Sequence, residues 1–280
     1  MPNLTSTALP VAIIALLWTP VSFGADFNDF ASAPAELVAP VVDRPDLIFE
    51  AGLGGGVAPV YQGSKDFGGT FNPIFKLERL NIPGIIDIGG NQSAGGFTFA
   101  PSIAVQGARK ASDHPELTGL TDLGMTFELG GKAGYEFDFT DALSAEFYGE
   151  LRYAVGGAKG FTGGVGLDLT DKLTSQFELV GGVSADFADK DYMGTFFGVT
   201  AAESLASGGK FAAYDPAGGV KSVNAKLAAK YEFVPDTFLN ASVEYRRLVG
   251  SAADSPIVKN GSDNQFLFGV GVSRRFSINY

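Results

Sequence analysis

The stretch Asn264 to Phe276 reads NQFLFGVGVSRRF and alternates between two sets of residues. One face carries Phe and Val and is interrupted by Arg274, while the opposite face is built mainly from Gly, Ser, Gln and Arg. A period of two predicts a β-strand whose faces meet different surroundings. Large apolar side chains on one face and small or polar ones on the other indicate lipid outside and a crowded lumen inside.

The same alternation continues to the last residue and places Phe276, Ile278 and Tyr280 on the apolar face. Arg274 lies near the end of the predicted strand, where a long cationic side chain can reach the membrane interface. Bacterial outer-membrane barrels usually end on an outward aromatic residue. Phe276 and Tyr280 are therefore the candidate assembly-signal aromatics.

The alternation recurs along the chain, and the apolar positions are repeatedly the odd-numbered ones. Nine further segments show it: residues 47–57, 71–78, 97–106, 125–138, 143–153, 161–169, 176–187, 222–233 and 239–246. We therefore predict an all-β fold, a transmembrane up-and-down antiparallel β-barrel of about ten strands. The segments Ile85–Gly89 and Tyr192–Val199 are ambiguous, and counting them as strands would make the alternative of twelve.

The predicted connections alternate in length, as such a barrel requires. Tight turns are expected at Thr140–Ala142, Thr170–Lys172 and Pro235–Asp236, and another connection begins at residues 81–84. Longer loops are expected at residues 61–69, 108–124, 188–220 and 250–263. With ten strands, both ends of the barrel sequence fall on the side of the short turns, which faces the periplasm in bacterial barrels.

The composition narrows the function classes. The chain has 280 residues, a net charge of -11 and no cysteine. The negative charge argues against a nucleic-acid partner, and the missing cysteine excludes a disulfide framework.

The alternative fold is a soluble β-sandwich or lipocalin-like barrel with its apolar face inward. The density of Phe and Tyr on that face, the strand lengths and a predicted export signal favour the membrane barrel instead.

Three segments are expected along the chain: a signal peptide at residues 1–24, a flexible periplasmic lead-in at 25–46, and the barrel at 47–280. The apolar run Leu9–Phe23 is too short and too interrupted by Pro for a spanning helix, and the small residues Ser22 and Gly24 fit cleavage after Gly24. No Lys or Arg precedes this run, unlike most signal peptides, so a buried or anchoring apolar helix is the alternative.

The face predicted to line the lumen carries many charges of both signs. They are Glu50, Glu78, Glu128, Lys132, Glu136, Glu146, Glu150, Arg152, Glu178, Lys226, Lys230, Glu244 and Arg246, together with Lys76 and Glu232. A ten-strand barrel is only slightly wider than the eight-strand barrel whose side chains fill it. We therefore predict that opposite charges pair across a closed lumen, with a narrow conducting path as the alternative.

Three stretches carry a family resemblance. GLGGGVAPVYQGSKDF (Gly52–Phe67), FAPSIAVQGARK (Phe99–Lys110) and EYRRLVGSAADSPIVKNGSDNQFLFGVGVSRRF (Glu244–Phe276) resemble the MipA/OmpV family of MltA-interacting outer-membrane proteins. The loop around Asp254, Ser255 and Pro256 is the more specific part. The residues SINY after Phe276 depart from the usual terminal Phe.

The resemblance implies a non-enzymatic barrel in the bacterial outer membrane that contacts lipid. Its named member is similar to a scaffold that links a lytic murein transglycosylase to a murein synthase, so these enzymes are the implied partners. Other members resemble porin-like or adhesive proteins, which makes a narrow channel or a surface-binding barrel the alternative function. No catalytic, metal or cofactor site is predicted, because His114 is the chain's one histidine and lies in a polar loop.

Overall fold

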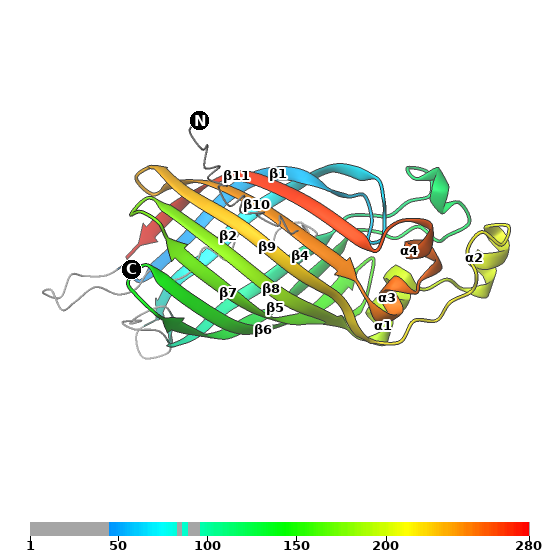
Figure 1. Ribbon diagram of the computed structural model, residues 1–280, viewed down its shortest axis with the longest axis horizontal. Helices are drawn as coiled ribbons and strands as arrows, with labels where there is room; N and C mark the ends of the chain where they lie inside the picture. The colour runs from blue at the N-terminus through cyan, green and yellow to red at the C-terminus, as the bar shows by residue number, and fades with distance from the viewer. Residues whose placement is uncertain (1–44, 83–85, 89–95, 280) are drawn as a thin grey trace, which may run out of the picture.

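The computed structural model describes residues 45–82, 86–88 and 96–279. Ten long strands form the wall of a barrel (Figure 1). They are β1 (Leu47–Pro59), β2 (Phe67–Ile82), β4 (Gly96–Gln106), β5 (Thr126–Asp138), β6 (Leu143–Gly156), β7 (Gly160–Lys172), β8 (Phe177–Ala188), β9 (Gly219–Val234), β10 (Thr237–Leu248) and β11 (Asn264–Ile278). A short strand, β3 (Ile86–Ile88), pairs with β2. The predicted membrane barrel of ten strands is confirmed.

Every neighbouring pair in the sheet is antiparallel, and the order is β3-β2-β1-β11-β10-β9-β8-β7-β6-β5-β4. The last strand pairs with the first, since Leu47 lies opposite Ile278 and Val57 opposite Phe268. The barrel is nearly closed, and β2 and β4 face each other at a seam where the described residues form no ladder. The remaining wall is continuous, so almost all strand edges are protected from lipid.

The alternation of side chains follows the sequence pattern. Outward side chains are large and exposed, with Phe97 at 71% and Leu129 at 53% of full exposure. Inward polar side chains are buried, with Glu128 at 1%. A soluble barrel would show the reverse arrangement, so the apolar outer surface is the surface that meets lipid.

Glycines on the inner face let side chains from other strands cross the lumen. A Cβ atom at Gly271 of β11 would lie 2.7 Å from Cδ1 of Ile74, which reaches across from β2. Ile74 is buried and contributes to a small apolar cluster with Val180 and Ala228 from the far wall. The alternating glycines of the last strand therefore make room for the lumen's contents.

The two ends of the barrel differ. At the turn end, the described connections are short: residues 139–142, 173–176 and 235–236. The opposite, loop end carries residues 60–66, 107–125, 157–159, 189–218 and 249–263. The three-residue hairpin 157–159 is an exception to the expected alternation. The turn expected at Thr170–Lys172 was placed too early, because β7 runs to Lys172 and pairs with β8 throughout.

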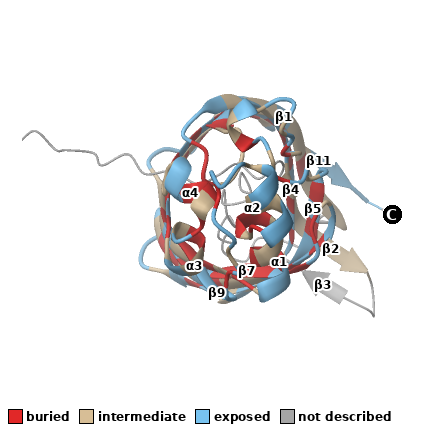
Figure 2. Cartoon of the chain, turned by 90° about the vertical axis from the view of Figure 1, so that its right-hand side faces the viewer, coloured by how far each residue is buried: buried red, intermediate tan, exposed pale blue. Residues whose placement is uncertain are grey.

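The loop end carries five short helical segments, visible on the right in Figure 1. They are η2 (Pro115–Leu117), α1 (Lys190–Phe197), α2 (Ala201–Ala206), α3 (Gly250–Ala253) and α4 (Pro256–Asn260). Viewed from this end, they lie across the mouth of the barrel (Figure 2). No helix in the described ranges is long and apolar enough to span a membrane.

The alternative of twelve strands is wrong. Residues Tyr192–Val199 are mostly helix α1, because Tyr192, Met193, Phe196 and Phe197 recur at helical spacing and are all buried on one side. Asp189 begins the helix, and its side chain accepts a hydrogen bond from the Tyr192 amide at 2.9 Å. The other ambiguous segment contributes only the three residues of β3.

Candidate functional site

The inner face of the barrel holds a chain of ion pairs that follows the barrel axis. At the turn end, Glu78 accepts from Arg275 at 2.8 Å, and Glu50 pairs with Lys230 and Ser273. Further along, Lys132 lies 2.8 Å from Glu146 and 3.7 Å from Asp168, and Lys226 lies 3.2 Å from Asp168. Nearer the loop end, Arg152 lies 2.7 Å from Glu150 and 3.1 Å from Glu128.

Several of these pairs skip one or two strands instead of joining adjacent ones. Lys230 on β9 reaches Glu50 on β1, although β10 and β11 lie between them in the sheet. Likewise, Arg246 on β10 reaches Asp186 on β8 at 3.4 Å, past β9. The small apolar cluster of Ile74 joins β2 to β8 and β9 and so bridges the lumen itself. Charged and apolar side chains together therefore occupy space that a conducting path would need.

Three partners in this network were missing from the predicted set: Asp168, Asp186 and Arg275. All three lie on the inward parity of their strands, so the same alternation could have found them. Glu244 lies 4.0 Å from Arg246, but the shorter contact of Arg246 is with Asp186.

Four of the predicted lumen charges have no ion pair among the described residues: Glu136, Glu178, Lys76 and Glu232. Glu136 is buried and lies opposite Glu146 in the β5–β6 register, so two like charges face each other. The Oε1 atom of Glu178 is buried without a hydrogen-bond partner in the described part of the chain, as is Nζ of Lys76. The pairing of the network is therefore incomplete.

An apolar plug closes the loop end. Tyr192, Met193, Phe196 and Phe197 of α1 pack with Ala154, Ala158, Ala188, Leu248, Ala252 and Val258 in one buried cluster. These partners come from the ends of β6, β8 and β10 and from α3 and α4. Burying four large side chains of one short helix is a substantial contribution, at roughly 1.5–3 kcal/mol for each.

The plug and the charge network meet at one hydrogen bond. The Tyr192 hydroxyl donates to Oε1 of Glu128 at 2.8 Å, and Gln106 donates to the same oxygen at 3.2 Å. Burial raises the pKa of Tyr192 well above its usual value, and the negative charge of Glu128 acts in the same direction. Tyr192 is therefore held as a neutral donor, and α1 is fixed in register with the lumen charges.

The loop residues Asp254, Ser255 and Pro256 form the joint between α1 and α4. Ser255 is fully buried, and its hydroxyl donates to the Phe197 carbonyl at 2.6 Å. The same hydroxyl accepts from the Ile257 amide and so caps α4, in which Pro256 occupies the first turn. Asp254 lies on the surface and pairs with Lys259 at 3.1 Å. This loop therefore has a structural role: the Ser255 hydroxyl holds α1 and α4 together, and we call it the clasp.

Phe276, one of the two candidate assembly-signal aromatics, lies at the turn end. Phe276 is outward and stacks on Phe49 with ring centroids 5.2 Å apart. Tyr280 lies outside the described residues, as do the expected signal peptide and most of the lead-in.

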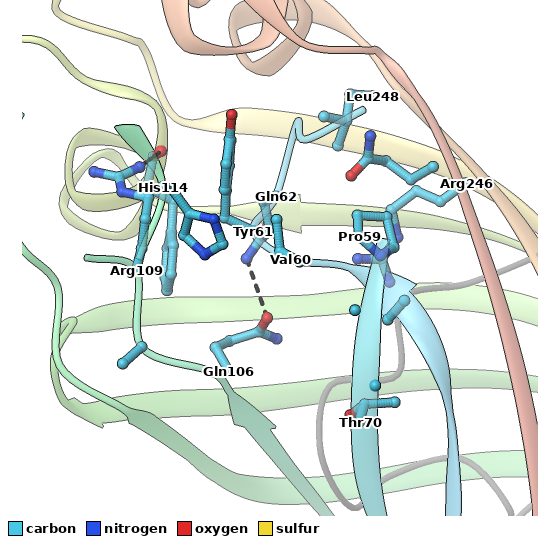
Figure 3. Close-up of a pocket in the computed structure, with 17 residues that line it drawn as sticks. Pro59, Val60, Tyr61, Gln62, Thr70, Gln106, Arg109, His114, Arg246 and Leu248 are labelled. Carbon is cyan, nitrogen blue, oxygen red and sulfur yellow. Dashed lines mark hydrogen bonds between the residues drawn. The ribbon is translucent and has the colours of Figure 1, made fainter. Parts of the chain in front are cut away.

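A cavity of about 250 Å³ lies beside the plug (Figure 3). Loop residues Tyr61 and Gln62, the end of β4 at Gln106, Arg109 and Phe196 of α1 are among the residues around it. His114 also lines the cavity, where its ring lies edge-on to Tyr61 at 5.7 Å and its Nδ1 lies 3.8 Å from Glu116. Within the described ranges, no three His, Cys, Asp or Glu side chains are placed to hold a metal ion.

The family described as MltA-interacting protein MipA matches residues 51–276, which cover most of the barrel. The chain belongs to this family. Together with the lipid-facing outer surface, the match places this MipA-family protein in the bacterial outer membrane. A comparison with curated proteins finds no match.

Among solved structures, the chain is similar to an outer membrane channel from Pseudomonas putida F1, with 11% identity, a TM-score of 0.45, and coverage of 86% of this chain and 100% of that one. It is also similar to the NanC porin, with 10% identity, a TM-score of 0.36 and coverage of 81% and 98%. A third is the attachment invasion locus protein Ail of Yersinia pestis, with 12% identity, a TM-score of 0.26 and coverage of 83% and 99%.

Proposed function

We propose that this MipA-family protein is a non-enzymatic, non-conducting scaffold that holds a murein-hydrolysing transglycosylase and a murein synthase at the outer membrane. The observation that carries the proposal is the filled lumen. Ion pairs line its wall along the axis, the apolar cluster of Ile74 bridges it, and the buried cluster of α1 caps it at the loop end. A barrel with a filled lumen is suited to anchoring partner proteins at the membrane, because it offers no path for a solute. The description of the family as MltA-interacting supports the choice of partner.

The absence of enzymatic activity is part of the proposal. His114 is the single histidine of the chain, and its described neighbours are Tyr61 and Glu116, with no nucleophile in hydrogen-bond contact. Most lumen carboxylates are paired with cations, as for Glu128 and Glu150 with Arg152. A carboxylate held in an ion pair is a poor general acid or base at neutral pH.

Partner enzymes in the periplasm would meet the turn end. A stable interface needs about 800 Å² on each partner. The described turns are too short to offer such an area: residues 139–142, 173–176 and 235–236. The sequence predicts a lead-in at 25–46 and a connector at 81–94 on this side, and we propose that these two segments carry the contacts.

The test combines capture with conductance. Full mature protein in detergent should capture a transglycosylase of the MltA type from an envelope extract, and deletion of residues 26–40 should reduce the yield. Heat-dependent gel mobility serves as the control that the deleted protein still folds as a barrel. Equal capture by both proteins would place the contacts elsewhere. Regular conductance steps from the intact barrel in a planar bilayer would favour the channel alternative and contradict the filled lumen.

A further inference from the structure

The cavity at the loop end is a shaped pocket. With about 250 Å³ it is smaller than a typical drug-sized site and holds the equivalent of roughly eight water molecules. It lies between the β1–β2 loop, the end of β4 and helix α1, next to the seam between β2 and β4 (Figure 3). In bacterial barrels the long loops face the outside. The pocket is therefore on the side from which an external solute arrives.

The charged residues that line the pocket are all basic. Arg109, Arg246 and His114 line it, and none of its lining residues is acidic. Arg246 is already paired with Asp186, and His114 has Glu116 nearby.

Arg109 has no such close partner. Glu203 and Asp122 act on its charge from farther away, and its guanidinium forms no ion pair in the described chain. An anion in the pocket would give this buried cation a direct counter-ion.

Arg109 is also held in place with an unused donor. Only 6% of the residue is exposed, and its Nη1 donates to the Phe196 carbonyl at 2.8 Å. Its Nε is buried and has no acceptor in the described part of the protein. Most buried polar groups in proteins are hydrogen-bonded, so an unused guanidinium donor beside a cavity marks a place for an acceptor.

Two other polar groups at the pocket have unused hydrogen-bonding capacity. The Oγ1 atom of Thr70 and the Oε1 atom of Gln62 are buried without partners among the described residues. The amide nitrogen of Gln62 is within 3.3 Å of both Gln106 Oε1 and Tyr192 Oη, which orients its side chain. Because Gln106 and Tyr192 both donate to Glu128, the pocket wall is continuous with the lumen network.

The rest of the lining is apolar or aromatic. Pro59, Val60, Tyr61, Phe196 and Leu248 surround the polar groups. A ligand therefore needs an apolar body as well as a negative group. Small-molecule sites commonly combine such an apolar lining with a few placed polar groups.

We propose that this pocket binds a small organic anion, a carboxylate attached to a planar apolar body, with the carboxylate on Arg109 and the body against Tyr61 and Phe196. The inference is independent of the scaffold function, because it concerns the opposite end of the barrel. It makes the loop end a recognition site for an external solute without requiring the solute to pass through the lumen.

The probes are benzoate, benzamide and benzylamine, which share a ring and differ in charge. Each is titrated into the detergent-solubilised full barrel by isothermal calorimetry. Benzoate should bind at least about tenfold more tightly than the other two, because a charge-assisted hydrogen bond to a buried guanidinium is worth that much or more. Arg109→Met should remove this preference. Arg109→Lys should keep part of it, since a charge remains without the second donor.

A control variant separates a site from a folding defect. Lys190→Met, which removes an exposed ion pair away from the pocket lining, should bind benzoate like the wild type. Heat-dependent gel mobility checks that each variant is folded. Equal affinities for the three probes, or no binding of benzoate to the folded wild type, would overturn the proposal.

Discussion

Replacing Arg152 by Met should be among the most destabilising single changes in the barrel. Its guanidinium lies 2.7 Å from Glu150 and 3.1 Å from Glu128, and it also donates to Ser102 at 3.0 Å. Methionine keeps much of the length and apolar stem of the side chain but leaves two carboxylates buried without their shared cation. Breaking a buried pair in this way costs about 3–5 kcal/mol.

An exposed pair of nearly the same length provides the control. Lys190 lies 2.8 Å from Asp215, with the two side chains 65% and 76% exposed, whereas those of Arg152 and Glu128 are 8% and 1% exposed. Surface pairs contribute about 0.2–1 kcal/mol. Lys190→Met should therefore change the free energy of unfolding by at most about a fifth to a third of the effect of Arg152→Met.

The assay is equilibrium unfolding in urea with lipid vesicles, followed by gel mobility and circular dichroism. Fluorescence is unsuitable, because the one tryptophan, Trp18, precedes the barrel. A triple variant that adds Glu128→Gln and Glu150→Gln to Arg152→Met should regain much of the loss, since no buried charge is then left unpaired. If Arg152→Met and Lys190→Met destabilise equally, the lumen is hydrated enough to screen its charges and the reasoning fails.

Three further predictions concern the loop end. Lys259→Cys should react with an impermeant maleimide on intact cells, because Lys259 is exposed at the loop end. Ser255→Cys should not react, because Ser255 is buried. Reaction of Lys259→Cys only after the outer membrane is opened would mean that the loop end faces the periplasm. Tyr192→Phe should cost about 1–3 kcal/mol by leaving Glu128 short of a donor, and an unchanged unfolding midpoint would contradict the link between plug and network. Burial alone would raise the pKa of Glu203, but hydrogen bonds from Thr200 and Thr121 outweigh it and lower the pKa from 4.5 to about 2. Because the folded-state pKa is the lower one, the contribution of Glu203 to α2 is complete above about pH 4.5 and is lost as the pH falls through about 2. Hydrogen exchange of the Thr121 and Thr200 amides, which donate to the Glu203 carboxylate, should show this loss.

The wall of the barrel was readable from local pattern alone. In Asn264–Phe276, each residue's face follows from its parity, since a strand turns by half a revolution per residue. The same parity placed Phe97 outward and Glu128 inward, as the structure has them. A lipid exterior makes the pattern unusually clean, because every outward position must be apolar.

Pairing within the lumen could not be read in this way. Lys132 lies opposite Glu150 in the β5–β6 register, but it also lies 2.8 Å from Glu146, on the same strand as Glu150, and 3.7 Å from Asp168 on β7. Which carboxylates a flexible lysine reaches depends on the width of the barrel and on what fills it. Pairs between strands that are not neighbours, such as Lys230 with Glu50, depend on the pairing of the last strand with the first.

The plug shows the same division. The helical spacing of Tyr192, Met193, Phe196 and Phe197 is present in the sequence, but so short an apolar run is compatible with a strand or a helix. The α1 assignment depends on the barrel mouth, where the ends of β6, β8 and β10 and the clasp at Ser255 bury all four side chains together. The pocket around Arg109 likewise exists only because Tyr61, Gln106 and Phe196, far apart in the chain, converge at that mouth. Parity and composition are local properties that the chain carries in any state. The ion-pair partners, the plug and the pocket depend on distances between residues far apart in the sequence, and these distances are set only once the sheet has closed on itself.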